Sequence, residues 1–131
     1  MPLTKSQKAE MLEPVLAHCR TVWTTLQAQH PKLARAQMPE IAINARLKSS
    51  AGRCFPSLNL VEFGTDFLLH SETFTTLMFR VIMPHELIHQ ADYVLHGESE
   101  FVHGHGAKWC EMMVQYGLPA NRFHPMGSFK R

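Results

Sequence analysis

Hydrophobic residues recur at helical spacing in two long segments of the chain. The first segment runs from about Ser6 to Gln29, and its hydrophobic residues return at intervals of three and four, as on one face of a helix. They are Leu12, Val15, Leu16, Cys19, Val22, Trp23 and Leu26. The second segment, from Glu72 to Leu95, has the same spacing in Phe74, Leu77, Met78, Val81, Ile88 and Leu95. The pattern therefore predicts two amphipathic helices that share one core.

Between these helices the pattern changes to the alternation that is typical of strands. Hydrophobic side chains at 41, 43, 45 and 47 alternate with the residues between them up to Lys48, which predicts a half-buried strand. The Ser49-Ser50 pair and Gly52 predict a turn, followed by short strands over 53–55 and 58–63, with Pro56 at an edge or bulge between them. We therefore expect an α+β fold with a small antiparallel sheet of about three strands.

The C-terminal part of the chain predicts one more short helix, over about 106–116. Its inward face would carry Trp109, Met112 and Met113. Pro84 interrupts the second long helix, and proline removes one backbone hydrogen bond there. It marks either a bend or the first turn of a new helix. In both cases His85 and His89 lie on one helical face.

Composition favours one compact domain over residues 1–131. The chain has 131 residues, 45% of them hydrophobic, which is enough for one core. No apolar run approaches the ~20 residues of a membrane span, and the first residues lack the apolar region of a signal peptide. Three scattered cysteines, Cys19, Cys54 and Cys110, argue against a disulfide framework and fit a reducing compartment. We therefore expect a cytoplasmic protein without membrane contacts; its oligomeric state stays open.

The segment His85-Glu86-Leu87-Ile88-His89 has the HExxH form of zinc peptidases. Positions i and i+4 of a helix share one face, so both imidazoles can reach one metal ion. Glu86 lies beside the two ligands, where a carboxylate can take a proton from a zinc-bound water and pass it to a leaving amine. The pattern indicates a catalytic Zn²⁺ site, with three protein ligands and one open position.

Several residues that follow His89 could supply the third ligand. His96 does not fit the metzincin pattern, because its spacing is off by one residue and the glycine is missing. Gly104 and Gly106 flank His105, which suits a tight turn that delivers a side chain to a fixed point. The other candidates are the carboxylates Glu98, Glu100 and Glu111, of which Glu111 is the most serious, and the imidazole of His103.

The motifs together resemble the SprT-like (Spartan) zinc metalloprotease family, which includes bacterial SprT proteins and a eukaryotic protease of DNA-protein crosslinks. The resemblance rests on HELIH after Met83-Pro84, a connector of about fifteen residues, and HGxxW from His105 to Trp109. It extends over roughly residues 40 to 124 through further similar segments. They are Ser50-Ala51-Gly52, the strand at 58–60, Phe67-Leu68-Leu69 and the run from Gly117 to Arg122.

This resemblance implies a zincin-like core with His85, His89 and His105 as zinc ligands, Glu86 as the general base and Glu111 outside the ligand set. It also implies that an extended protein or peptide substrate pairs with an edge strand beside the metal. His103 or Tyr93 could assist at the oxyanion, and Asp92 could orient an imidazole. Bacterial SprT proteins commonly end in a cysteine-bearing zinc ribbon, whereas this chain has no CxxC pair. We therefore expect at most weak DNA binding.

Two functions from different classes fit these observations. The first is a zinc endopeptidase that cleaves DNA-associated or DNA-crosslinked proteins, and the intact Glu86 favours it. The second is a non-proteolytic, transcription- or DNA-related interaction domain in which zinc is mainly structural. The charge adds little, because a net charge of +2 is far from strongly basic. Arg46, Lys48 and Arg53 are expected on one face of the sheet and are the candidate DNA contacts.

Overall fold

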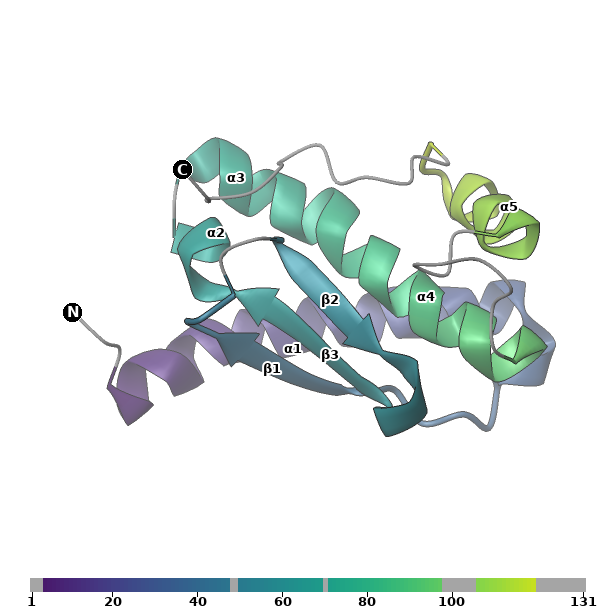
Figure 1. Ribbon diagram of the computed structural model, residues 1–131, viewed down its shortest axis with the longest axis horizontal. Helices are drawn as coiled ribbons and strands as arrows, with labels where there is room; N and C mark the ends of the chain where they lie inside the picture. The colour runs from purple at the N-terminus through teal and green to yellow at the C-terminus, as the bar shows by residue number, and fades with distance from the viewer. Residues whose placement is uncertain (1–3, 48–49, 70, 98–105, 120–131) are drawn as a thin grey trace.

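The computed structural model describes residues 4–47, 50–69, 71–97 and 106–119 (Figure 1). Their helices are α1 (Lys5–Gln29), α2 (Thr65–Leu69), α3 (Glu72–Leu77), α4 (Met83–His96) and α5 (Ala107–Tyr116). Their strands are β1 (Glu40–Asn44), β2 (Gly52–Phe55) and β3 (Leu60–Gly64). This confirms the α+β class. None of the helices within the described ranges combines the length and the apolar character that a bilayer crossing requires.

The sheet has the strand order β1-β3-β2, so β3 lies in the centre and β1 and β2 form the edges. The strands β2 and β3 pair antiparallel, with Gly52 opposite Phe63, whereas β1 and β3 pair parallel, with Ile41 opposite Val61. The expectation of an antiparallel sheet was therefore wrong for β1. Each strand runs opposite to the strand before it in the chain, so β3 runs in the same direction as β1. Because β3 inserts between β1 and β2, it pairs with β1 as a parallel neighbour.

Two strands are shorter than their hydrophobic patterns predicted. The strand β1 ends at Asn44, whose side-chain Oδ1 accepts a hydrogen bond from the Arg46 amide at 2.9 Å and turns the chain. Leu47 is nevertheless buried. The strand β3 begins at Leu60 because a 3₁₀ turn over Pro56–Leu58 and a left-handed Asn59 precede it. Alternation of hydrophobic residues continued through both turns, and for this reason it gave no sign of the strand ends.

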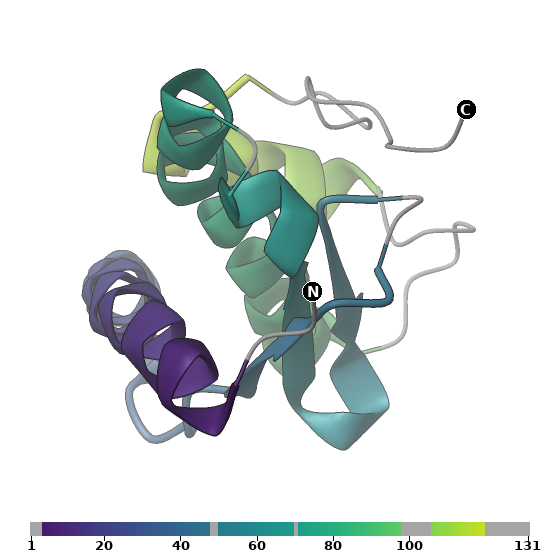
Figure 2. The same cartoon turned by 90° about the vertical axis from the view of Figure 1, so that its left-hand side faces the viewer.

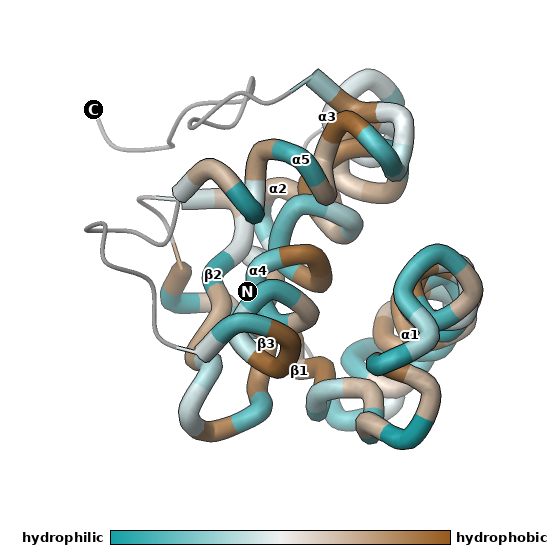
Figure 3. Tube along the Cα trace, turned by 90° about the vertical axis from the view of Figure 1, so that its right-hand side faces the viewer, coloured by the Kyte–Doolittle hydropathy of each residue, from teal (hydrophilic) through white to brown (hydrophobic). Residues whose placement is uncertain are grey.

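The helices α1 and α4 cover one face of the sheet, and the core lies between these layers (Figure 2). The predicted inward face of α1 is confirmed, since Val15, Cys19, Val22, Trp23 and Leu26 are buried. From the sheet, Val61 and Phe63 point into the same core. Figure 3 shows hydrophobic residues of β1, β3 and α4 gathered in the centre of the molecule. Burial of these apolar side chains is the main contribution to the stability of the fold.

A π-helical turn, η3 (Met78–Ile82), joins α3 to α4 and explains the proline that follows it. The Met83 amide donates to the Met78 carbonyl, five residues back. The next amide in this series would belong to Pro84, which has no N–H and cannot donate to the Phe79 carbonyl. Instead, Nε2 of His18 on α1 lies 2.6 Å from the Phe79 carbonyl oxygen and donates to it. Pro84 therefore lies in the first turn of α4, which begins at Met83, as one of the two predicted alternatives had it.

The wider π turn also shifts the hydrophobic face of the helix that follows. The hydrophobic face predicted for a regular α-helix from Glu72 to Leu95 did not include four residues of this segment that are fully buried. They are Ile82, Met83, Leu87 and Ala91. The predicted members Met78 and Ile88 are buried, Leu77, Val81 and Leu95 are partly buried, and the side chain of Phe74 lies outside the described part. As a result α4 is buried on most of its circumference.

Candidate active site

The two histidines of the HExxH segment lie side by side on α4. Their ring centroids are 4.9 Å apart, with an angle of 70° between the ring planes. His85 is buried and His89 is half-buried. The predicted common face of the two imidazoles is confirmed, and it is directed toward α5.

Trp109 of α5 contacts both imidazoles. Its ring centroid lies 5.0 Å from that of His85 and 4.9 Å from that of His89, and it is stacked on His89 with an interplanar angle of 15°. The indole is fully buried, so it restricts the rotamers that either imidazole can adopt. The hydrophobic pattern predicted only that Trp109 packs inward. A tryptophan four residues after a candidate ligand was the signal of this more specific role.

The carboxylate of Glu86 lies on the neighbouring side of α4, which faces β2. Glu86 is only 4% exposed, and its Oε2 lies 3.9 Å from Nε2 of His85. A Cβ atom at Gly52 would lie 3.1 Å from Cγ of Glu86 and 3.0–3.2 Å from side-chain atoms of Phe63 and Ile82. Glycine at position 52 therefore lets the backbone of β2 pass unusually close to the base. In the sequence Gly52 was interpreted as a turn residue and as part of the Ser50-Ala51-Gly52 segment, and its closeness to Glu86 was not predicted.

Gln90 follows the second histidine and joins α4 to β2. The thiol of Cys54 donates to its Oε1 at 3.5 Å, and its Nε2 donates to the Pro56 carbonyl at 3.3 Å. Burial, and after it the negative charge of Glu86, raises the pKa of the Cys54 thiol well above its usual range. Cys54 therefore stays a neutral thiol and a hydrogen-bond donor. Sequence patterns gave no indication of this contact.

The candidates for a third ligand fall into two groups. His105, His103, Glu98 and Glu100 lie outside the described residues, so the assignment of His105 stays a prediction. Glu111 is exposed on α5, in contrast to the buried His85. His96 is engaged elsewhere, because its Nδ1 lies 2.7 Å from Oδ1 of Asp92. The imidazole that Asp92 orients is thus that of His96.

The chemistry of the donors fits zinc. Two imidazoles on one helical face, with a carboxylate beside them, match the donor types that zinc prefers. Within the ranges that the structure describes, no group of three His, Cys, Asp or Glu side chains could hold a metal ion. The predicted ligand His105, which lies between two glycines, and the alternative His103 are outside these ranges.

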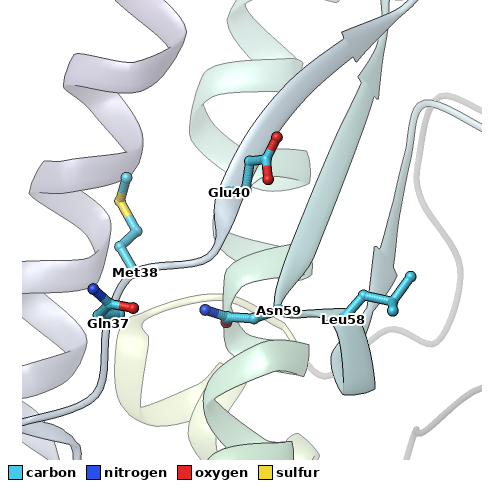
Figure 4. Close-up of a pocket in the computed structure, with 5 residues that line it drawn as sticks. All are labelled: Gln37, Met38, Glu40, Leu58 and Asn59. Atoms are coloured by element: carbon cyan, nitrogen blue, oxygen red, sulfur yellow. The ribbon is translucent and has the colours of Figure 1, made fainter.

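An open hollow of about 460 Å³ lies at the start of β1 and β3, and it is lined by none of these residues (Figure 4). Its walls come from the segment before β1 and from the turn before β3. They are Gln37, Met38, Glu40, Leu58 and Asn59. The wall contains one carboxylate and no imidazole or thiol, so this hollow offers no counterpart to the chemistry on α4.

Comparison with known proteins agrees with the sequence motifs. The model of the SprT-like family matches residues 22–125, which include α4, α5 and the whole sheet. No curated protein and no solved structure shows a significant match to the chain.

Proposed function

The chain belongs to the SprT-like family, and from this premise we propose that it is a zinc-dependent endopeptidase. One observation carries the proposal. The two HExxH imidazoles lie 4.9 Å apart and both contact Trp109, the tryptophan of the HGxxW segment, while Glu86 is buried beside them. A helix used only for packing would gain nothing from two buried and one half-buried polar side chains at these positions.

His85 and His89 would hold the metal together with His105. A neutral imidazole is a common zinc ligand, and ring packing on Trp109 limits the rotation that would otherwise oppose binding. His105 lies four residues before Trp109 in the sequence, so the third proposed ligand and the tryptophan that contacts the other two belong to one short segment of the chain. Zinc, when bound, supplies a Lewis acid that polarises the scissile carbonyl and makes water more acidic.

Glu86 would act as the general base and then as the general acid. Its carboxylate takes a proton from the attacking water, whose oxygen forms a bond to the carbonyl carbon. When the C–N bond breaks, Glu86 returns that proton to the leaving amine nitrogen. Burial at 4% exposure excludes bulk water from the base, which limits competing proton exchange.

The edge strand β2 would bind the substrate in an extended conformation. Its outer edge has no neighbouring strand within the described sheet, and Gly52 brings its backbone next to Glu86. Backbone hydrogen bonds to an edge strand depend little on the sequence of the bound segment. This suits a peptidase that accepts many different proteins.

We further propose DNA-associated or DNA-crosslinked proteins as the substrates. The candidate DNA contacts are only partly available, since Nε of Arg53 lies 3.2 Å from Oε1 of Glu62 and its guanidinium lies over the Phe55 ring. Arg46 is exposed, and Lys48 lies outside the described residues. We expect DNA binding no tighter than about 10⁻⁶ M at physiological salt, with a steep loss as salt rises.

The test is cleavage of a DNA-bound protein by zinc-loaded chain, with and without DNA and with and without a chelator. We expect about one zinc per chain and cleavage that the chelator abolishes. Metal analysis is run on the same samples. A chain that binds zinc tightly but cleaves no protein under any of these conditions would refute the peptidase proposal and favour an interaction domain with a structural zinc site.

A further inference from the structure

Gln90 is a buried polar residue that the proposed chemistry does not use. It follows His89 directly, yet its side chain lies on the side of α4 that faces β2 and is 2% exposed. A buried amide is unfavourable unless its donor and acceptor are both paired. In Gln90 both are paired, Oε1 with the Cys54 thiol and Nε2 with the Pro56 carbonyl.

The two partners of Gln90 lie at the far half of β2 and just beyond its end. The backbone of Gly52, at the start of β2, passes so close to Glu86 and Ile82 that a Cβ atom there would lie 3.1–3.2 Å from their side chains. Cys54 contacts Gln90, four residues after Glu86. The strand therefore runs along α4 and is attached to it at two points. Close packing makes the first attachment, and the Gln90 amide makes the second.

We propose that Gln90 is a positioning residue that keeps β2 ordered against α4, at a fixed depth and register relative to Glu86, before the substrate binds. The inference rests on the proposed peptidase function, in which β2 binds the substrate. An edge strand that is already ordered binds an extended peptide without a further loss of its own conformational entropy. Without the amide, the end of β2 near Pro56 keeps its pairing with β3 but loses its attachment to α4, so the substrate itself must fix its position against the helix.

This role predicts a specific kinetic pattern. Loss of two hydrogen bonds of ordinary strength should raise KM roughly 5- to 30-fold. The value of kcat should stay within about threefold, because a bound substrate restores the position of β2 and because Glu86 and both histidines keep their own contacts. A residue that served only the stability of the fold would lower the amount of folded protein and leave KM unchanged.

The variants are chosen to separate these possibilities. Gln90→Leu keeps a similar volume and removes both hydrogen bonds, and the Pro56 carbonyl stays paired with the Asn59 amide at 3.1 Å. Cys54→Ala removes one hydrogen bond without a change in α4, and Cys54→Ser restores a donor. Gln29→Leu is the matched control, because Nε2 of Gln29 also donates to a backbone carbonyl, that of Gln115 at 3.3 Å, between α1 and α5.

Three measurements on the zinc-loaded chain of 131 residues complete the test. They are amide hydrogen exchange, kcat and KM for an extended peptide, and the affinity for that peptide in the Glu86→Gln background, where no cleavage competes. We expect Gln90→Leu and, less strongly, Cys54→Ala to speed exchange over residues 52–55, raise KM and weaken peptide binding. Cys54→Ser and Gln29→Leu should do none of these.

Either of two results would overturn the role of Gln90. Unchanged exchange over residues 52–55 in Gln90→Leu would show that the amide does not order β2. Faster exchange with unchanged KM and unchanged peptide affinity would show that its role is structural only. If the parent chain cleaves no peptide, the peptidase proposal fails separately, and equal peptide affinity of the parent and Gln90→Leu would still reject the positioning role.

Discussion

The two sides of α4 that meet at the proposed active site are stabilised in different ways. On the side toward α5, His85 and His89 are held by ring packing on Trp109. On the side toward β2, Glu86 and Gln90 meet a strand backbone, through close approach at Gly52 and hydrogen bonds at Cys54 and Pro56. Neighbouring helical residues point about 100° apart, so an offset of one residue separates the proposed ligands from the proposed base. The comparison suggests that metal binding and proton transfer can be altered independently.

The largest effect is expected on the side toward α5. His89→Ala removes a proposed zinc ligand, so zinc content should fall from about one per chain to a small fraction and peptide hydrolysis to background. Metal analysis after gel filtration and a peptidase assay measure both. His96→Ala is the control, because His96 lies on the same helix but bonds to Asp92. A His96→Ala variant that also lost its zinc would place the metal elsewhere on α4.

A smaller effect is expected from Gly52→Ala on the side toward β2. The added methyl group would lie 3.1 Å from Cγ of Glu86, so the base must move by a few tenths of an ångström or β2 must retreat. We expect kcat/KM to fall roughly 10- to 100-fold while zinc is retained. Gly64→Ala is the matched control, since its Cβ would meet Phe67 and the Leu47 carbonyl but not the base. Equal losses of kcat/KM per folded molecule in both variants would contradict a specific role for Gly52.

A third side of the helical segment, toward α1, should affect stability and leave zinc in place. His18→Ala leaves the Phe79 carbonyl without the donor that Pro84 cannot provide, which should lower the free energy of unfolding by about 1–3 kcal/mol. Chemical denaturation of the zinc-free chain measures this loss. His18→Gln, which keeps a donor, should lose less. An unchanged unfolding free energy in His18→Ala would mean that the π turn does not need His18.

Sequence patterns predicted the parts of the molecule that depend on local regularity. The buried face of α1, the three strands and the pairing of His85 with His89 follow from spacing alone, because a helix repeats every 3.6 residues. The direction of β1 could not be predicted, since alternation reports burial and says nothing about the neighbouring strand. The π turn at Met78–Ile82 was equally hidden, because one extra residue changes the phase of the helix without a change in composition. Gln90 was missed for a related reason, since its partners are 34 and 36 residues away in the sequence.

The most direct measurement compares zinc content and peptide hydrolysis in Glu86→Gln and in the parent chain. The amide keeps the shape of the carboxylate but cannot accept a proton from water, so we expect about one zinc per chain in both proteins. The value of kcat should fall by roughly two to four orders of magnitude in the variant. Hydrolysis at the parent rate with zinc bound would contradict the role of Glu86 as the base, and loss of zinc together with activity would contradict the separation of ligands and base on the two sides of α4.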